Sequence, residues 1–142
     1  MKGFLCAAWI GLLFVFTCIW DVTELNEVAS RAPQISQHPD WSGFTDGYKL
    51  EADMVVRKVG HVAGFAVLQA ILYWRFRSLV RTIAMSAAFA LLTELLQPLF
   101  FRGGRALDVL VDLVGIAGAA IVISVLRRSR RMRDKPSRTS MQ

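Results

Sequence analysis

Five ionisable residues interrupt an otherwise apolar stretch that runs from position 94 to position 118. They are Glu94, Arg102, Arg105, Asp108 and Asp112. Apolar runs of bilayer character flank the stretch, and an ionisable group inside a bilayer costs about 2.5–3.5 kcal/mol on insertion scales. A chain keeps such groups where they are paired, hydrated or used. Carboxylates and cationic side chains together can hold an ionic or phosphorylated group.

Three bases begin a second apolar segment, in the sequence VRKVGH. Arg57 and His61 are four residues apart and share a helix face, and Lys58 lies three residues before the histidine. On the later segment, Asp108 and Asp112 repeat the spacing of four. The candidate residues of a polar pocket are therefore Arg57, Lys58, His61, Glu94, Gln97, Arg102, Asp108 and Asp112.

Four apolar runs must position these residues, and they predict an all-α fold, a polytopic membrane four-helix bundle. The chain has 142 residues and is 54% hydrophobic, and its charges are clustered rather than scattered. The first run has a thin positive region before it and no small-residue cleavage site after it, which favours an uncleaved helix over a signal peptide. The expected membrane domain is residues 1–126, with spans at 4–20, 54–74, 82–101 and 106–126, an outer loop at 21–53, and then a basic tail at 127–142.

Lysine and arginine predict the orientation of the bundle, because short segments rich in them stay in the cytoplasm. Eleven of the seventeen lie in three segments, which are Lys2, the turn at 75–81 and the tail after Leu126. Both termini are therefore expected in the cytoplasm. The tail lacks apolar periodicity, so we expect it to be disordered and attracted to anionic lipid rather than to bind nucleic acid.

This orientation brings acids and bases from three spans to the outer side of the membrane. Glu94 lies seven residues before Phe101, and Asp112 lies seven residues after Arg105, so each is about 10 Å deep on the helix rise. His61 is slightly shallower. One interpretation is a salt-bridge cluster that fixes the bundle. The other, which the shared depth of the two carboxylates favours, is a polar pocket open to the outside.

Small and polar residues predict how the spans pack. Gly60–Gly64 and Gly115–Ala119 are pairs of small residues four apart, and we expect them to let the second and fourth spans approach closely. Gln69 is expected to make an interhelical hydrogen bond. Pro98 lacks an N–H group, so the third span is expected to kink or end early there.

Two of these segments resemble the VanZ-like family of bacterial membrane proteins. They are VRKVGHVAGF at positions 56–65 and TELLQPLFFRGGRALDVLVDLVG at positions 93–115. The family pattern runs VRK-x-x-H, then E-x-x-Q, then an arginine, and then D-V-L-x-D-x-x-G. The matching residues are Arg57, Lys58, His61, Glu94, Gln97, Arg102, Asp108, Asp112 and Gly115. The sequence departs from the pattern at Gly64 and Phe65, where many relatives have an acidic residue and a tyrosine, and at Pro98, which lies further from the arginine.

The resemblance implies a protein of the cell envelope. The family takes its name from a protein linked to resistance to teicoplanin, a glycopeptide that binds peptidoglycan precursors outside the cell. One hypothesis is a non-enzymatic membrane factor whose pocket binds a lipid-linked envelope precursor or the drug, or alters access to it. The alternative is an intramembrane enzyme acting on a lipid-linked phosphorylated precursor, with His61 or Glu94 as base and the arginines on phosphate. A purely structural subunit of a larger complex is a third hypothesis.

The pattern also limits the expected ligands. We expect membrane lipid as a partner and no nucleic acid, and the sequence specifies no oligomeric state. No cofactor is expected, and no metal ion, because a single histidine with acids is a weak set of metal ligands. The non-enzymatic hypothesis is favoured because no serine or cysteine nucleophile accompanies His61 in the pattern.

Overall fold

The structure is a computed structural model, and it describes residues 2–19, 35–45, 52–100 and 104–133. Its elements, in chain order, are α1 (Lys2–Phe14), the π-helix η1 (Val15–Ile19), the 3-10 helix η3 (Ser42–Thr45), α3 (Ala52–Phe76), α4 (Leu79–Leu96), the 3-10 helix η4 (Gln97–Phe100) and α5 (Ala106–Arg133). No strand occurs in these ranges. The predicted all-α fold is therefore confirmed.

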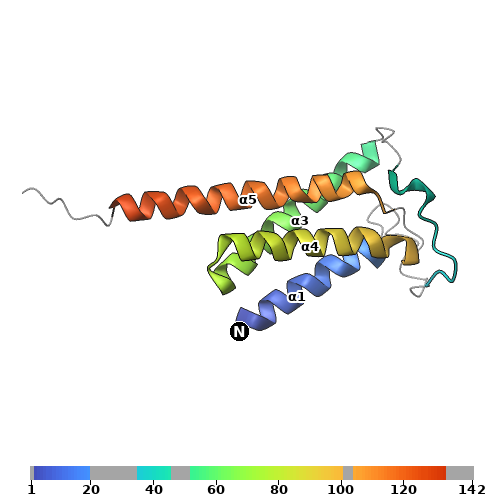
Figure 1. Cartoon of the computed structure of the whole chain (residues 1–142), viewed down its shortest axis with the longest axis horizontal. Coiled ribbons are helices and arrows are strands. Elements are labelled where there is room, and N and C mark those ends of the chain that lie inside the picture. The colour runs from blue at the N-terminus through green and yellow to red at the C-terminus, as the bar shows by residue number, and fades with distance from the viewer. Residues whose placement is uncertain (1, 20–34, 46–51, 101–103, 134–142) are drawn as a thin grey trace, which may run out of the picture.

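Within the described ranges, three helical segments are long and apolar enough to cross a bilayer. They are Val55–Phe76, Leu79–Phe100 and Ala106–Arg133. A hydrocarbon core about 30 Å thick needs about 20 apolar helical residues, since each residue rises about 1.5 Å. The apolar helix at Lys2–Cys18 is shorter, and it lies alongside the others in a bundle of four (Figure 1).

α3 is the central helix of this bundle, because it packs against α1, α4 and α5. At one end of the bundle, the Lys2 ammonium lies 4.8 Å from the centre of the Trp74 ring. The Arg127 guanidinium lies 5.7 Å from the centre of the Tyr73 ring. The amino terminus, the α3–α4 turn and the carboxyl-terminal half of α5 therefore share one end, which we call the basic end (Figure 1). It is the end predicted to face the cytoplasm.

Local chemistry explains where the helices stop. Arg77 adopts the left-handed backbone conformation with φ 57°, and its N–H donates to the Tyr73 carbonyl at 2.9 Å. A residue in this conformation commonly closes the last turn of a helix. At the other end of the bundle, α4 tightens into η4 because Pro98 has no N–H to donate to the carbonyl of Glu94. The predicted early end of the third α-helix is thus confirmed.

The last helix is longer than predicted. The fourth span was expected to end at residue 126 and to be followed by a disordered tail, but α5 continues to Arg133. The added residues, RRSRRMR, contain no glycine or proline, and arginine is a good helix former. Their positive charge is also favourable at the carboxyl end of a helix, where the backbone dipole is negative. The rest of the predicted tail lies outside the described residues.

A buried hydrogen-bonded layer joins α3 to α4. The Gln69 side chain is wholly buried. Its Nε2 donates to Thr82 Oγ1 at 3.0 Å, and its Oε1 accepts from Ser86 Oγ at 3.0 Å. The interhelical hydrogen bond predicted for this residue is confirmed. The apolar core is formed by Phe65, Leu68, Leu72, Ala90 and Ile116.

Replacing Ser86 by alanine should lower the free energy of unfolding by about 1 kcal/mol, the upper part of the usual range for an interhelical hydrogen bond in a membrane protein. The matched control is Ser124→Ala, because Ser124 is exposed and donates within its own helix to the Ala120 carbonyl at 2.8 Å. It should change stability little. Unfolding in mixed micelles measures both variants, and equal effects would contradict an interhelical role for Ser86.

The closest approach of α5 to α3 occurs at Gly115, which is buried. A Cβ atom at this position would overlap the backbone of Val62 on α3. Ala119, one turn further along α5, is half-buried. A small residue at position 115 therefore sets how near the two helices can lie, as expected where backbones pack closely in a membrane.

Gly60 and Gly64 of α3 do not make the predicted contact with α5, and only Gly64 packs against a neighbouring helix. Gly64 lies against the side chain of Leu13 on α1, and its carbonyl accepts a hydrogen bond from Trp9 Nε1 at 3.2 Å. Gly60 has nothing within 4 Å of where a Cβ would stand. Positions 60 and 64 are each two residues from Val62, so at about 100° per residue they lie on the opposite face of α3 from α5.

Candidate functional site

A buried carboxylate joins the end of α4 to the start of α5. Glu94 is wholly buried. Its Oε1 accepts from Gln97 Nε2 at 2.6 Å, and its Oε2 accepts from the backbone N–H of Arg105 at 3.0 Å. The first bond is local, since the two side chains are three residues apart on one face. The second bond fixes the beginning of α5 against α4.

The turn before α5 depends on a residue without a side chain. Gly104 is buried, and a Cβ at this position would overlap the backbone carbonyl oxygen of Glu94 and lie close to Pro98 Cδ. The glycine thereby lets the following amide of Arg105 reach the Glu94 carboxylate. Arg102, which the sequence analysis placed at this turn in the polar pocket, lies outside the described residues.

α3 and α5 meet at a histidine–carboxylate pair. His61 Nδ1 lies 2.9 Å from Asp112 Oδ1, and the side chains are 17% and 0% exposed. The second carboxylate oxygen, Asp112 Oδ2, is buried and has no hydrogen-bond partner among the residues that the structure describes. Buried carboxylate oxygens of this kind are uncommon, because the loss of hydration is then left uncompensated.

His61, Glu94 and Asp112 form a compact group contributed by α3, α4 and α5. Each residue offers a nitrogen or oxygen atom, and these three atoms all lie within 4.8 Å of one another. We call this group the three-helix cluster. The spacing within each span placed these residues at similar depths, and the packing of α3 against both α4 and α5 brings their side chains together.

The remaining predicted pocket residues lie nearer the end of the bundle. Lys58 Nζ lies 3.3 Å from Asp108 Oδ1, and the two side chains are 27% and 16% exposed. This pair joins α3 to the first turn of α5, as a salt bridge that fixes the bundle would. Arg57, on the neighbouring position of α3, instead lines a groove.

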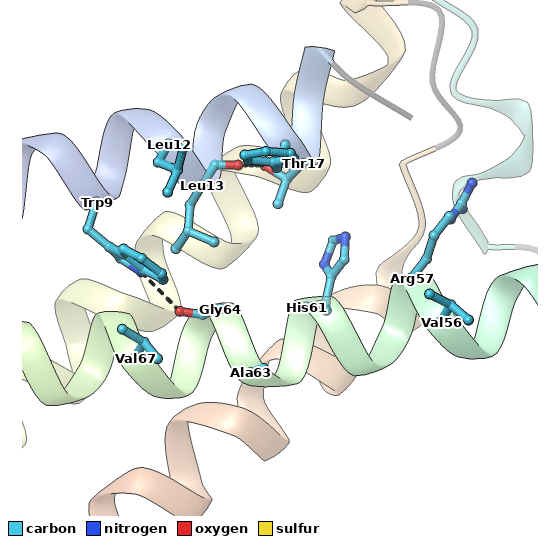
Figure 2. Close-up of a pocket in the computed structure, with 12 residues that line it drawn as sticks. Trp9, Leu12, Leu13, Thr17, Val56, Arg57, His61, Ala63, Gly64 and Val67 are labelled. Carbon is cyan, nitrogen blue, oxygen red and sulfur yellow. Dashed lines mark hydrogen bonds between the residues drawn. The ribbon is translucent and has the colours of Figure 1, made fainter. Parts of the chain in front are cut away.

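The groove has a volume of about 440 Å³ and lies between α3 and the α1–η1 segment. Figure 2 shows Trp9 and Leu13 extending from α1 toward α3, with His61 and Arg57 further along the same side of α3. Apolar side chains form most of its wall, which includes Trp9, Leu12, Leu13, Phe16, Val56 and Val67. His61 belongs to the groove and to the three-helix cluster, so one wall residue of the groove contacts the buried Asp112 carboxylate.

Comparison with known proteins assigns this chain to a family. The model of the family described as VanZ/LLP1 matches residues 3–127. The chain belongs to the VanZ/LLP1 family. A relative from Bacillus subtilis (strain 168), named "Uncharacterized membrane protein YwnJ", is 34% identical over 140 residues, which cover 95% of this chain and 99% of the relative. No solved structure matches. Because three helices in the described part of the chain are long and apolar enough to span a membrane, and the relative is named a membrane protein, this VanZ/LLP1 member is a multi-pass bacterial membrane protein.

The contribution of α1 to the groove of this VanZ/LLP1 protein was not predicted from the sequence. Trp9 and Leu13 face α3, whereas Phe4 and Leu5 are exposed. The sequence KGFLCAAWIGLLF is apolar nearly all round, so periodicity could not show which face packs. Trp9 was the one available signal, because its indole N–H needs an acceptor when it is buried.

Proposed function

We propose that this VanZ/LLP1 protein binds an envelope lipid with an anionic headgroup in the groove between α1 and α3. The observation that carries the proposal is the composition of the groove, which has an apolar wall with Arg57 and His61 toward one end. Its volume of about 440 Å³ lies within the range of ligand sites. An acyl or isoprenoid chain fits the apolar wall, and the planar donors of a guanidinium fit phosphate oxygens.

The distribution of charge supports the outer leaflet as the source of this lipid. Arg57 and His61 lie near the end of α3 that is opposite the basic end of the bundle. The basic end faces the cytoplasm if this protein follows the positive-inside rule. The groove then accepts lipids from the side on which lipid-linked peptidoglycan precursors meet teicoplanin. Binding such a precursor would alter the access of the drug to it, so a contribution to glycopeptide resistance is an expected consequence of this function.

Filling the groove should weaken lipid binding by about tenfold or more, which corresponds to about 1.4 kcal/mol. Gly60→Leu is the variant of choice, because position 60 lines the groove and nothing lies within 4 Å of a Cβ there. Purified protein in detergent is titrated with undecaprenyl phosphate, phosphatidylglycerol or phosphatidylcholine, and bound lipid is counted by native mass spectrometry. The wild-type protein should bind the two anionic lipids more tightly than phosphatidylcholine.

The matched control is Gly118→Leu on α5, since a Cβ there also has nothing within 4 Å and the position does not line the groove. This variant should bind lipid as the wild type does. Equal weakening by both variants, or equal affinity for zwitterionic and anionic lipids, would contradict the proposal. In cells, expression of the wild-type protein should protect against teicoplanin, and Gly60→Leu should remove that protection.

The pairing of His61 with Asp112 supports a second candidate, an intramembrane enzyme acting on a lipid-linked phosphate. A carboxylate 2.9 Å from one ring nitrogen can hold an imidazole in a fixed orientation, as it does in general-base catalysis. This enzyme would hydrolyse undecaprenyl diphosphate with water to undecaprenyl phosphate and inorganic phosphate, and His61→Gln would stop this release. Binding without phosphate release by the wild type would exclude this candidate.

A further inference from the structure

Asp112 lacks part of the compensation that a buried carboxylate needs. Its side chain is wholly buried, and His61 Nδ1 contacts Oδ1. Oδ2 is the buried side-chain atom that makes no hydrogen bond within the described part of the chain. Removing a carboxylate from water costs several kcal/mol, which is normally offset by several donors or by a cation. The unpartnered oxygen therefore points to a ligand.

We propose that His61, Glu94 and Asp112 bind a divalent transition-metal ion such as Zn²⁺ or Mn²⁺. Their three ligand atoms lie within 4.8 Å of one another. Bonds from Zn²⁺ to nitrogen or oxygen are about 2.0–2.2 Å long, so ligand atoms around one ion lie roughly 3–4 Å apart. Small side-chain rotations close the difference. The ion would bring two positive charges to the two buried carboxylates.

The chemistry of the ligands selects the class of ion. An imidazole nitrogen suits Zn²⁺ and its neighbours in the first transition row, and carboxylates suit Mn²⁺ as well. Ca²⁺ and Mg²⁺ prefer sites made of oxygen alone. No metal ion was expected from the sequence, because one histidine with acids is a weak set of metal ligands. The structure adds the burial of both acids and the unpartnered Asp112 oxygen, which no spacing in the sequence could show.

The surroundings of Glu94 also suit a metal ligand. The Gln97 amide and the Arg105 backbone N–H each bond one of its oxygens, and each oxygen keeps a further lone pair. Carboxylates that bind metals are commonly held by hydrogen bonds in this way. Three protein ligands leave a position open for water or an oxyanion. Since His61 also lines the groove, an anionic ligand in the groove lies beside the ion.

Metal binding is tested on wild-type protein purified in detergent, without added lipid and with a purification tag that contains no histidine. The protein is incubated with Zn²⁺ or Mn²⁺, and free ion is then removed. Inductively coupled plasma mass spectrometry should find about one bound ion per chain. The melting temperature should rise with the ion and fall again with a chelator, because a ligand that binds only the folded state stabilises it. Absence of both effects with both ions would overturn the proposal.

Two variants locate the ion. Asp112→Asn should weaken metal binding by roughly 100-fold or more, since even the loss of groups that support metal ligands costs 10- to 100-fold. The matched control is Asp108→Asn, one turn earlier on α5, whose carboxylate pairs with Lys58 and lies outside the ligand group. It should keep the metal. If Asp112→Asn does not fold, Glu94→Gln and His61→Gln take its place with the same expected loss.

Undiminished metal binding in Asp112→Asn, or equal loss in Asp108→Asn, would also overturn the proposal. The metal site does not rest on the proposed lipid binding, because the ion is measured without added lipid. Gly60→Leu separates the two, since it should reduce lipid binding and leave metal content unchanged. If the wild-type protein binds the metal ion but shows no preference for anionic lipid, the proposed metal site is supported and the proposed lipid-binding function is contradicted.

Discussion

Gly115→Leu is expected to prevent α3 and α5 from packing and to remove most folded protein from detergent extracts. A Cβ at this position would overlap the backbone of Val62, and backbone cannot rotate aside as a side chain does. Inserting larger groups into a packed interior commonly costs about 1–3 kcal/mol, and a clash with backbone belongs at or above the top of that range. Size-exclusion chromatography of a fluorescent fusion measures the folded fraction, and thermal unfolding measures the stability of what remains.

The control for this variant is Gly118→Leu, on the same helix and with nothing within 4 Å of a Cβ. Both substitutions replace a glycine in α5 by the same good helix former, so helix propensity cannot explain a difference between them. The expected result is near-normal recovery for Gly118→Leu and little or none for Gly115→Leu. Similar recovery of the two would show that α5 can move away from Val62 at small cost.

Gly104→Ala should destabilise the protein by about 2 kcal/mol or more, although it adds a single methyl group. The methyl would overlap the Glu94 carbonyl oxygen and displace the Arg105 N–H from the Glu94 carboxylate, which it now reaches at 3.0 Å. Leaving a buried donor or acceptor without its hydrogen-bond partner costs about 1–3 kcal/mol, and the steric overlap adds to this cost. Chemical unfolding in mixed micelles gives the change in free energy.

The matched change is Gly11→Ala, in a helix where a Cβ has nothing within 4 Å. It should be neutral or slightly stabilising, because alanine is the better helix former by roughly 1 kcal/mol. If Gly104→Ala is equally harmless, the turn before α5 accommodates a side chain and the Glu94–Arg105 contact contributes little.

Apolar runs and a proline were enough to predict most of the fold. The three long spans follow from runs of apolar residues, and the early end of α4 follows from the missing N–H of Pro98. The helical residues 127–133 were missed because a basic segment without an apolar face looks like a tail, while arginine itself favours helix. The face of α3 that meets α5 was missed as well, since the GxxxG spacing at Gly60 and Gly64 does not say which neighbour it faces.

The candidate site was predictable in its residue types and not in its contacts. Spacing placed His61, Glu94 and Asp112 at similar depths, yet only the packing of three helices shows that they lie within 4.8 Å of one another. The packing of the helices also decides the surroundings of the two adjacent bases on α3. Lys58 pairs with Asp108, whereas Arg57 lines the groove. The contribution of α1 to the groove could not be predicted, because its sequence shows no helical alternation of apolar and polar residues.

The order of the chain has a consequence for insertion into the membrane. His61 precedes Asp112 by 51 residues and Lys58 precedes Asp108 by 50, so each base is synthesised before the acid that it meets. At about 5–20 residues per second, the interval is roughly 3–10 s. Until α5 is synthesised, the imidazole of His61 can remain neutral in the membrane. In the reverse order of synthesis, the carboxylate of Asp112 would be in the membrane without its basic partner. α5 therefore enters the bilayer beside partners that are already in place, and its acids need not cross the apolar phase alone.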